Sequence, residues 1–209
     1  MQTEVSGVGQ LINEQKSLLE QIAKEKIEAQ LKTAELEKKI FQDQSEQNYR
    51  QVSGLFAVQS VLENKDKFGV VNGLVSELAE VEEKYRLALE VAAGSYLSAL
   101  VVQNEQVARL AIEFLRDNRL GVATFLPLNK INSRFIDKDT EEVLTMPGVV
   151  GLASKLIKHE GKFANIFSFI FGQTIVVENL LAAQKIGVGR ARMVTLDGDV
   201  VEKSGAMKG

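Results

Sequence analysis

Residues 70–78 are Val70-Val71-Asn72-Gly73-Leu74-Val75-Ser76-Glu77-Leu78, and residues 149–156 repeat this stretch in altered form as Val149-Val150-Gly151-Leu152-Ala153-Ser154-Lys155-Leu156. At a constant offset of 78 residues, the agreement extends to Gly94 in the first copy and Gly172 in the second. The second copy is then shortened by three residues, after which residues 100–104 match residues 175–179. Because order, spacing and chemical type all agree, the sequence predicts an internal duplication.

Both copies predict the same order of elements: a helix closed by a glycine, a short buried strand, a second helix and a second strand. In the first copy, Tyr85, Leu89 and Ala92 share one helical face, and Gly94 ends that helix. After this helix, the first copy is expected to form a strand at residues 99–102, a helix at 105–118 and a strand at 122–126. In the second copy, strands are expected at residues 174–177 and 191–196. Helices that alternate with strands predict a mixed α/β fold.

The segment before the duplication has a different pattern. Residues 10–51 contain neither glycine nor proline, and their apolar residues, from Ile12 to Phe41, are spaced by three, four or seven. Pairs such as Glu20 and Lys24 add only about 0.2–0.5 kcal/mol each, so the apolar stripe must be buried against something. We expect one strand of a coiled coil, with a helix packed on its own globule as the alternative. Gly54 is expected to interrupt the helical pattern.

These patterns divide the chain into four parts. We expect a coiled-coil arm and junction in residues 1–65, a first subdomain in residues 66–130, and a second subdomain in residues 148–209. The polar residues 131–147 are expected to form an exposed linker between the two subdomains. The prediction is therefore a globule of two similar α/β subdomains, preceded by a long coiled-coil helix.

Composition excludes several kinds of chemistry. The 209 residues are 45% hydrophobic and 25% charged, which is typical of a globular protein. The absence of cysteine excludes disulfides and thiol chemistry, and a single histidine, His159, argues against zinc sites built from imidazoles. No uninterrupted apolar run of roughly 18 residues predicts a membrane span, and the N-terminus does not resemble a signal peptide.

Two motifs could bind a ligand, and both are incomplete. Gly187-Val188-Gly189 lacks the third glycine of a dinucleotide-binding loop and follows a helix instead of a strand, so a turn entering a strand is favoured. Asp137, Asp139 and Glu141 have the spacing of a calcium loop, but the glycine and the final glutamate of that loop are missing. We therefore expect no metal and no cofactor, and we interpret the acidic residues as a solvated linker.

Two further features could take part in acid–base catalysis. Asp197-Gly198-Asp199 offers two carboxylates, but Asp-Gly between apolar runs is also a strong hairpin signal, and we favour the hairpin. His159 stands in a polar stretch without a serine or aspartate partner and is expected to be a surface residue of a loop. We find no catalytic constellation in the sequence.

The overall net charge of −3 predicts no global attraction to nucleic acid or anionic membranes. From Val150 onward, however, eight basic residues stand against five acidic ones. This mild basic bias could serve contacts to phosphate groups, or it could serve solubility alone.

A coiled-coil arm followed by a duplicated α/β globule resembles the hinge domain of structural maintenance of chromosomes (SMC) proteins, over about residues 50–209. The segments that carry the resemblance are Gly73-Leu74-Val75-Ser76-Glu77-Leu78, Leu87-Ala88-Leu89-Glu90, Gly121-Val122-Ala123-Thr124-Phe125-Leu126-Pro127-Leu128 and Val194-Thr195-Leu196-Asp197-Gly198-Asp199-Val200-Val201. Gly198, Gly205 and Gly209 are similar to the family's glycine motif, whose last glycine would be residue 210. We therefore expect the sequence to end within that motif.

The resemblance implies a non-catalytic module that dimerises two SMC chains, by default two copies of one chain. It implies that Gly198, Gly205 and Gly209 line the dimer interface. It also implies secondary, non-specific binding of single- or double-stranded DNA, for which the candidates in the second copy are Lys155, Lys158, Arg190, Arg192, Lys203 and Lys208.

The same resemblance implies parts that lie outside this sequence. These are ATPase heads and a returning C-terminal arm whose helix would pair with residues 1–65. A cytoplasmic, nucleoid-associated location and no membrane contact are also implied. Two alternatives remain open: a DNA-binding module in which dimerisation is incidental, and a small-ligand α/β enzyme that uses the turn at Gly187.

Overall fold

The structure is a computed structural model that describes residues 32–33 and 54–209. Lys32 and Thr33 are helical, and the rest of the apolar stripe predicted for the arm lies outside the described residues. The chain divides into two compact units at Val52 and Ser53, and the unit that begins at Ser53 contains both subdomains.

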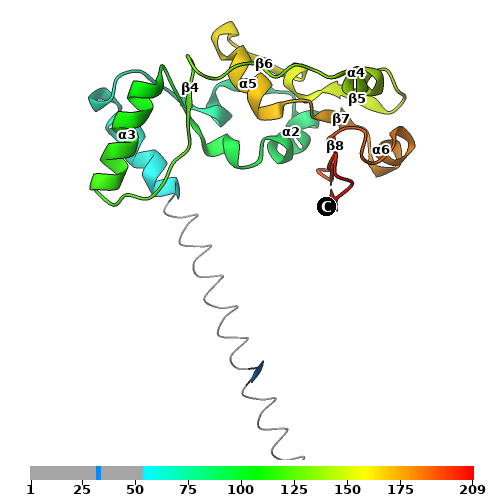
Figure 1. The fold of residues 1–209 in the computed structure, drawn as a ribbon, viewed down its shortest axis with the longest axis horizontal. Helices are drawn as coiled ribbons and strands as arrows, with labels where there is room; N and C mark the ends of the chain where they lie inside the picture. The colour runs from blue at the N-terminus through cyan, green and yellow to red at the C-terminus, as the bar shows by residue number, and fades with distance from the viewer. Residues whose placement is uncertain (1–31, 34–53) are drawn as a thin grey trace, which may run out of the picture. The chain divides into compact units, whose positions relative to one another are not determined.

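The two subdomains repeat the same elements, which confirms the predicted duplication. The first contains strands β1 (Val71–Leu74) and β2 (Ala79–Val81), helix α2 (Arg86–Ala93), strand β3 (Leu100–Val102), helix α3 (Glu105–Asp117) and strand β4 (Phe125–Pro127). The second contains β5 (Val149–Leu152), β6 (Ile157–His159), α5 (Ala164–Phe171), β7 (Ile175–Val177), α6 (Leu180–Ile186) and β8 (Met193–Thr195). Figure 1 shows α3 and α6 at opposite ends of the globule, with α2 and α5 between them.

The remaining elements are short. Single 3₁₀ turns are η1 (Lys65–Lys67), η2 (Val75–Glu77), η3 (Glu83–Tyr85), η4 (Gly94–Ser98), η5 (Ala153–Lys155) and η6 (Gly161–Phe163). The second subdomain continues into strands β9 (Val200–Val201) and β10 (Met207–Lys208), and helix α4 (Lys138–Leu144) lies between the subdomains in sequence.

Each subdomain is built on a sheet with the same topology. The first sheet has the order β1-β3-β4, and the second has β5-β7-β8 extended by β9 and β10. In both, the first strand is antiparallel to the central strand and the last strand is parallel to it. The central strands β3 and β7 are completely buried, in agreement with the apolar runs from which they were predicted.

The helix ends follow from local sequence. Asn104 caps α3 by accepting hydrogen bonds from the backbone amides of Gln106 and Val107, and Asn179 caps α6 in the same way. Gly94 and Gly172 end α2 and α5, both with a φ of 54°. Glycine is the residue that adopts this backbone conformation at least cost, and this explains its presence at both positions.

One strand pair joins the two subdomains. Strand β2 lies antiparallel to β6, and Glu80 is the partner of Lys158 in the register. These two residues are also equivalent in the duplication, because they are 78 positions apart. The pair therefore lies on a local pseudo-two-fold axis that relates the first subdomain to the second.

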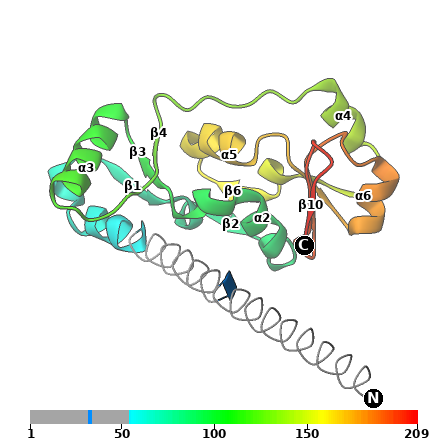
Figure 2. The same ribbon diagram turned by 60° about the horizontal axis from the view of Figure 1, so that its bottom comes forward.

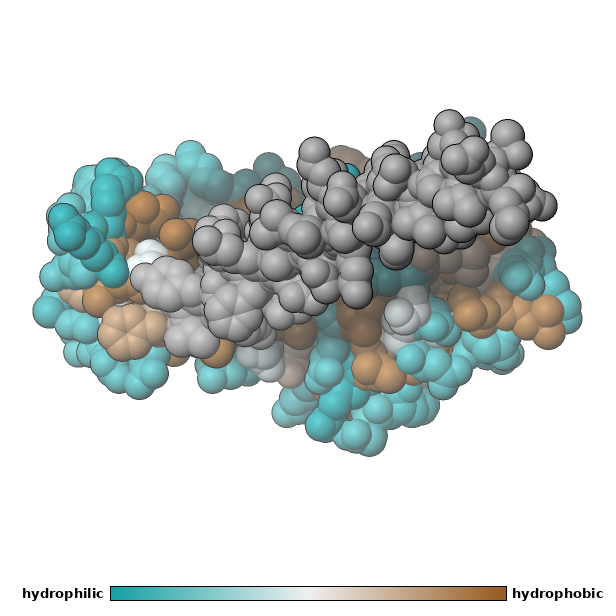
Figure 3. All heavy atoms as spheres, turned by 90° about the horizontal axis from the view of Figure 1, so that it is seen from below, coloured by the Kyte–Doolittle hydropathy of each residue, from teal (hydrophilic) through white to brown (hydrophobic). Residues whose placement is uncertain are grey.

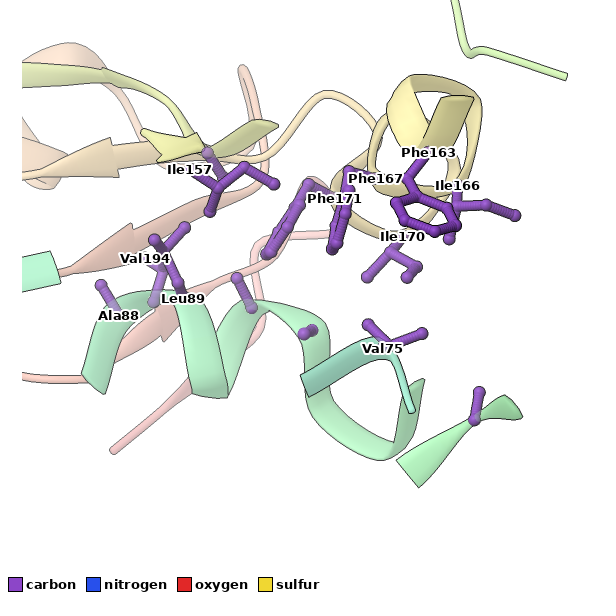
Figure 4. Close-up of a cluster of buried hydrophobic side chains, with 14 of the residues drawn as sticks. Val75, Ala88, Leu89, Ile157, Phe163, Ile166, Phe167, Ile170, Phe171 and Val194 are labelled. Atoms are coloured by element: carbon purple, nitrogen blue, oxygen red, sulfur yellow. The ribbon is translucent and has the colours of Figure 1, made fainter. Parts of the chain in front are cut away.

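The largest apolar core lies along the same seam and draws on both subdomains. Val75, Leu89 and Ala92 of the first subdomain pack with Phe163, Phe167 and Val194 of the second, all buried. Figure 4 shows Phe167 and Phe171 of the second subdomain turned toward the helix that carries Ala88 and Leu89. Burial of apolar surface here contributes to the stability of both subdomains at once.

The described part of the junction begins with a helix. Residues 54–63 are helical, so Gly54 is the first described residue of a helix, and the segment before it, where we expected the interruption, lies outside the described residues. Ala57, Val58 and Val61 of this helix are buried against α3 and β3 in the smaller core of the first subdomain. A Cβ atom on Gly54 would lie 3.8 Å from the carbonyl oxygen of Val122, an ordinary contact, so this position does not require glycine.

The linker is not entirely exposed, and that part of its prediction is wrong. Residues 138–144 form α4, in which Thr140 and Val143 are buried against the second subdomain. Asp137 caps this helix by accepting a hydrogen bond from the Thr140 amide at 2.9 Å. In Figure 2 the segment between β4 and α4 runs past α5, where the Arg134 amide donates to Ser168 Oγ.

Two smaller expectations also need correction. His159 is the last residue of strand β6, not part of a surface loop, and its ring stacks on Phe167 at 5.0 Å between centroids. The strand expected at residues 122–126 begins only at Phe125, and Val122 is 82% exposed. Exposed hydrophobic side chains of this kind are scattered among hydrophilic ones on the face shown in Figure 3.

The shared core predicts that the subdomains unfold together. Replacing Phe167, which is 2% exposed, with alanine should lower the free energy of unfolding by about 3–5 kcal/mol. Urea denaturation followed by circular dichroism should still show a single transition. Ile112→Ala, at an exposed position on α3, is the matched control and should change little. Two separate transitions in the Phe167 variant would contradict a common core.

The cap of α4 predicts an unusual carboxyl titration. Hydrogen bonding to Thr140 and then the Lys203 ammonium lower the pKa of Asp137 from 3.8 to about 2. A lowered pKa means that this carboxylate stabilises the fold fully above about pH 4 and loses that effect as the pH falls toward 2. NMR titration of the side-chain carbonyl should show this value directly.

Lys203→Gln should raise the pKa of Asp137 but leave it below 3.8, because the hydrogen bonds to Thr140 remain. Lys158→Gln, which removes a lysine that forms no ion pair with Asp137, is the control and should leave the pKa unchanged. An Asp137 that titrates near 3.8 in the unmodified chain would show that the cap does not form.

Candidate functional site

Strands β8 and β9 form a tight hairpin, as Asp197-Gly198 predicted. Met193 pairs with Val201 and Val194 with Val200, and Gly198 at the turn has a φ of 93°. The Asp199 carboxylate accepts a hydrogen bond from Thr195 Oγ1 at 3.0 Å, and its amide donates to the same hydroxyl at 2.9 Å. Asp199 is thus held within the turn, which supports the hairpin over the acid–base interpretation.

The tip of this hairpin approaches helix α2 of the other subdomain. A Cβ atom on Gly198 would lie 3.2 Å from Leu87 Cγ and 3.5 Å from Val91 Cγ2. The contact with Leu87 is tighter than most real Cβ contacts, the contact with Val91 is ordinary, and the positive φ adds strain for any other residue. Gly198 therefore allows the hairpin tip to pack closely on α2 within one chain, independently of any contact with a second chain.

A groove of about 620 Å³ opens beside this contact. Its apolar lining includes Val91, Gly94, Gly198, Val200, Met207 and Gly209. Two of the three glycines predicted for the interface, Gly198 and Gly209, thus line one groove. Gly205 lies in the turn before β10, and its ideal Cβ position is 4.0 Å from Val188.

The groove ends at an unpaired strand edge. Among residues 32–33 and 54–209, β10 is the outermost strand of the second sheet and pairs only with β9. The Glu202 amide donates to the Ala206 carbonyl at 2.8 Å, so the backbone groups of Ala206 face β9. Because these groups alternate along a strand, the amide and carbonyl of Met207 face outward.

The first sheet has a matching open edge at β4. β4 pairs only with β3, through bonds from the Leu100 amide to the Thr124 carbonyl and from the Leu128 amide to the Val102 carbonyl. The same alternation turns the amide and carbonyl of Phe125 outward. Pro127 has no amide hydrogen, and its carbonyl accepts from the amides of Lys130 and Ile131, both at 3.1 Å, so the open part of this edge is at Phe125. In the second subdomain, the equivalent edge of β8 is occupied by β9.

The six basic residues predicted for DNA fall into two groups, three paired with acidic side chains and three exposed. Three of them pair with acidic side chains of the same chain: Arg190 with Glu142 at 3.2 Å, Arg192 with Glu202 at 3.3 Å, and Lys203 with Asp137 at 3.1 Å. Lys155, Lys158 and Lys208 are exposed. The sequence could not distinguish these two groups, because the acidic partners lie 10 to 66 residues away.

A second cavity, of about 460 Å³, lies where the turns after α2 and α5 meet. Its basic lining residues offset the negative ends of these two helices. Near the end of α2, Arg192 donates a hydrogen bond to the Ala92 carbonyl. At the end of α5, Arg134 lies close to Gly172, because a Cβ atom added to that glycine would be 3.4 Å from Arg134 Nη1. Arg134 was not among the predicted site residues, because nothing in its local sequence indicates this position.

The motifs considered for other chemistry have structural roles. Gly187 ends α6 and Gly189 lies in the turn toward β8, as expected of a strand-entry turn. Asp137, of the calcium-like spacing, is the cap of α4. Within residues 32–33 and 54–209, no group of three or more histidines or carboxylates could hold a metal ion. No helix in that part of the chain is long and apolar enough to cross a membrane.

Comparison with known proteins identifies relatives of this globule. Residues 68–187 match the family described as SMC proteins Flexible Hinge Domain. The whole chain is 41% identical to part of the chromosome partition protein Smc of Synechocystis, and 75% of it is 36% identical to that of Bacillus subtilis. The chain spans only 17% and 14% of the lengths of these two relatives.

Solved structures agree with this match. An SMC hinge domain from Geobacillus stearothermophilus, crystallised as an asymmetric dimer, has a TM-score of 0.70 and 35% identity, over 82% of this chain and 72% of that one. A Pyrococcus furiosus Smc hinge domain with an extended coiled coil has a TM-score of 0.65 and 35% identity, over 78% and 56% of the two chains. The family match and the mixed α/β fold agree, and the chain belongs to the SMC hinge domains, a non-catalytic part of SMC proteins.

Proposed function

We propose that this chain is the dimerisation module of a chromosome partition protein and that it pairs with a second copy of itself. The observation that carries the proposal is the groove of about 620 Å³ beside β10, which Gly198 and Gly209 line next to a strand edge that no described strand covers. The dimer of the Geobacillus hinge supports it.

The duplication supplies a geometric reason for two contacts. Each chain has an open edge at β4 in its first subdomain and another at β10 in its second. In a two-fold dimer, β4 of one copy meets β10 of the other, and the reverse contact follows by symmetry. Gly198, Gly205 and Gly209 would then lie at or beside both contacts.

Two features that belong to the whole protein follow as proposals. The segment before residue 54 would be one helix of a coiled coil whose partner lies outside this sequence, as the extended coiled coil of the Pyrococcus hinge suggests. The ATPase activity would reside in other domains, and the protein would act in the cytoplasm, on the nucleoid. No cofactor is needed for this function.

DNA binding is proposed as a secondary function. The exposed lysines Lys155, Lys158 and Lys208 support it, because their ammonium groups do not form ion pairs with the described acidic residues. Arg190, Arg192 and Lys203 are weaker candidates, since each would have to leave an acidic partner before it contacts phosphate. Such binding would be non-specific and sensitive to salt.

Met207→Pro should weaken the dimer selectively. Proline removes the outward-facing amide of Met207, but it removes no hydrogen bond between β10 and β9, and an edge strand tolerates it. We expect the dimer dissociation constant, measured by sedimentation equilibrium, to rise at least tenfold, with little change in the thermal midpoint of the monomer at high dilution. Met207→Ala keeps the amide and is the matched control.

Because the chain contains no cysteine, the contact can also be tested by cross-linking two differently tagged copies, one carrying Phe125→Cys and the other Met207→Cys. If the Phe125→Cys copy is exchanged for a copy that carries Ile112→Cys, on α3, the cross-link to Met207→Cys should disappear. Efficient cross-linking with Ile112→Cys, or an unchanged Met207→Pro dimer, would argue against this contact.

Replacing Lys155 and Lys158 together with glutamine should reduce DNA binding. If both contact phosphate, the slope of log affinity against log salt for duplex DNA should fall by up to about 1.8. Fluorescence anisotropy over a range of salt concentrations measures this slope. Lys138→Gln with Lys185→Gln removes the same charge elsewhere and should leave the slope unchanged. Equal effects of the two double variants would exclude a local DNA site.

A further inference from the structure

Arg192 joins three parts of the globule through one guanidinium group. It precedes β8, and its Nη1 donates to the hydroxyl of Thr174 at 2.8 Å and to the Ala92 carbonyl at 3.3 Å. Its Nε donates to the Glu202 carboxylate at 3.3 Å. The contacts therefore reach the end of α2, the residue before β7 and the residue after β9.

Arg192 and its partner Glu202 both line the groove, and its partner Ala92 is next to a lining residue. Ala92 follows Val91 in α2, and Val91 lines the groove beside Gly198. Glu202 lies at the end of β9 and bonds through its amide to the Ala206 carbonyl, immediately before β10. Arg192 thus fixes the spacing between α2 on one side and the β9–β10 turn on the other.

The chemistry of arginine suits this position. A planar guanidinium can donate in several fixed directions at once, whereas a lysine ammonium offers one compact charge. A cation near the end of α2 is also favoured by the helix dipole. The Arg192 side chain is 32% exposed, less than Arg190 or Lys203 in their own ion pairs, so water weakens its contacts less.

A second ion pair holds the turn from the opposite side. Lys203, next to Glu202, bonds to Asp137 at 3.1 Å and lies 3.8 Å from Asp139, both in the segment that begins α4. The β9–β10 turn is therefore held between α2 and α4. Of the two contacts, only that of Arg192 reaches the groove wall made by the first subdomain.

We propose that Arg192 is a positioning residue for dimerisation: it sets the width of the groove and the placement of β10 before a second copy binds. This inference rests on the proposed function as a dimerisation module. It assigns Arg192 to the dimer contact and removes it from the DNA-binding candidates. Arg192 itself need not touch the partner.

The test compares Arg192→Gln with Arg192→Lys in the 209-residue chain. We expect Arg192→Gln to raise the dimer dissociation constant about tenfold in sedimentation equilibrium, while Arg192→Lys, which keeps the charge, restores part of the loss. Adding Glu202→Gln to Arg192→Gln should weaken the dimer little further, because both changes remove one contact. The thermal midpoint of the monomer at high dilution and the salt slope of DNA binding should stay nearly unchanged.

Arg109→Gln is the matched control, since it breaks an exposed arginine–glutamate pair on α3 at 2.7 Å, away from the groove. If Arg192→Gln dimerises as well as Arg109→Gln, the inference is wrong. If Arg192→Gln lowers the free energy of monomer unfolding by as much as it lowers the free energy of dimerisation, Arg192 has a purely structural role and the inference is wrong. A wild-type chain that remains monomeric would overturn the proposed dimerisation function itself. Failure of that function can therefore be distinguished from failure of the inference about Arg192 alone.

Discussion

The pairing of β2 with β6, together with the apolar core beneath it, is the constraint on which the rest of the globule depends. Strands of three residues would be marginal alone. They persist because Val75 and Leu89 of one subdomain are buried with Phe163 and Phe167 of the other. Neither subdomain completes this core without its counterpart, so the two are parts of one folding unit.

The same constraint places the groove. Since the seam fixes α2 against the second subdomain, the tip of the β8–β9 hairpin can reach Leu87 and Val91. The site that we associate with dimerisation is therefore shared by both subdomains before a partner arrives. The arrangement of the chain's own halves decides what a second chain would meet.

The duplication also explains how much of this could be predicted. Paired positions in the two copies indicated α2 and α5, the buried strands β3 and β7, and the glycines that close the helices, because these features depend on local periodicity and backbone conformation. The hairpin at Gly198 was predictable for the same reason. The resemblance to SMC hinges added the interface glycines, which periodicity alone could not supply.

The errors have a different origin. α4 is only seven residues long and depends on Val143 finding a buried place in the second subdomain. His159 could be placed in a strand only once β2 was known to lie beside it. Which basic residues form ion pairs depends on acidic partners far away in the sequence, such as Asp137 for Lys203. Such long-range contacts leave no periodic signal in one sequence.

One detail of the first sheet bears on how the chain survives alone. Pro127 faces the open edge of β4 without an amide hydrogen, so this edge offers a stray strand a donor only at Phe125. An exposed edge with a full row of donors and acceptors would recruit any extended chain and promote aggregation. Pro127 thus confines pairing at this edge to a short stretch, which disfavours aggregation of a single copy through β4.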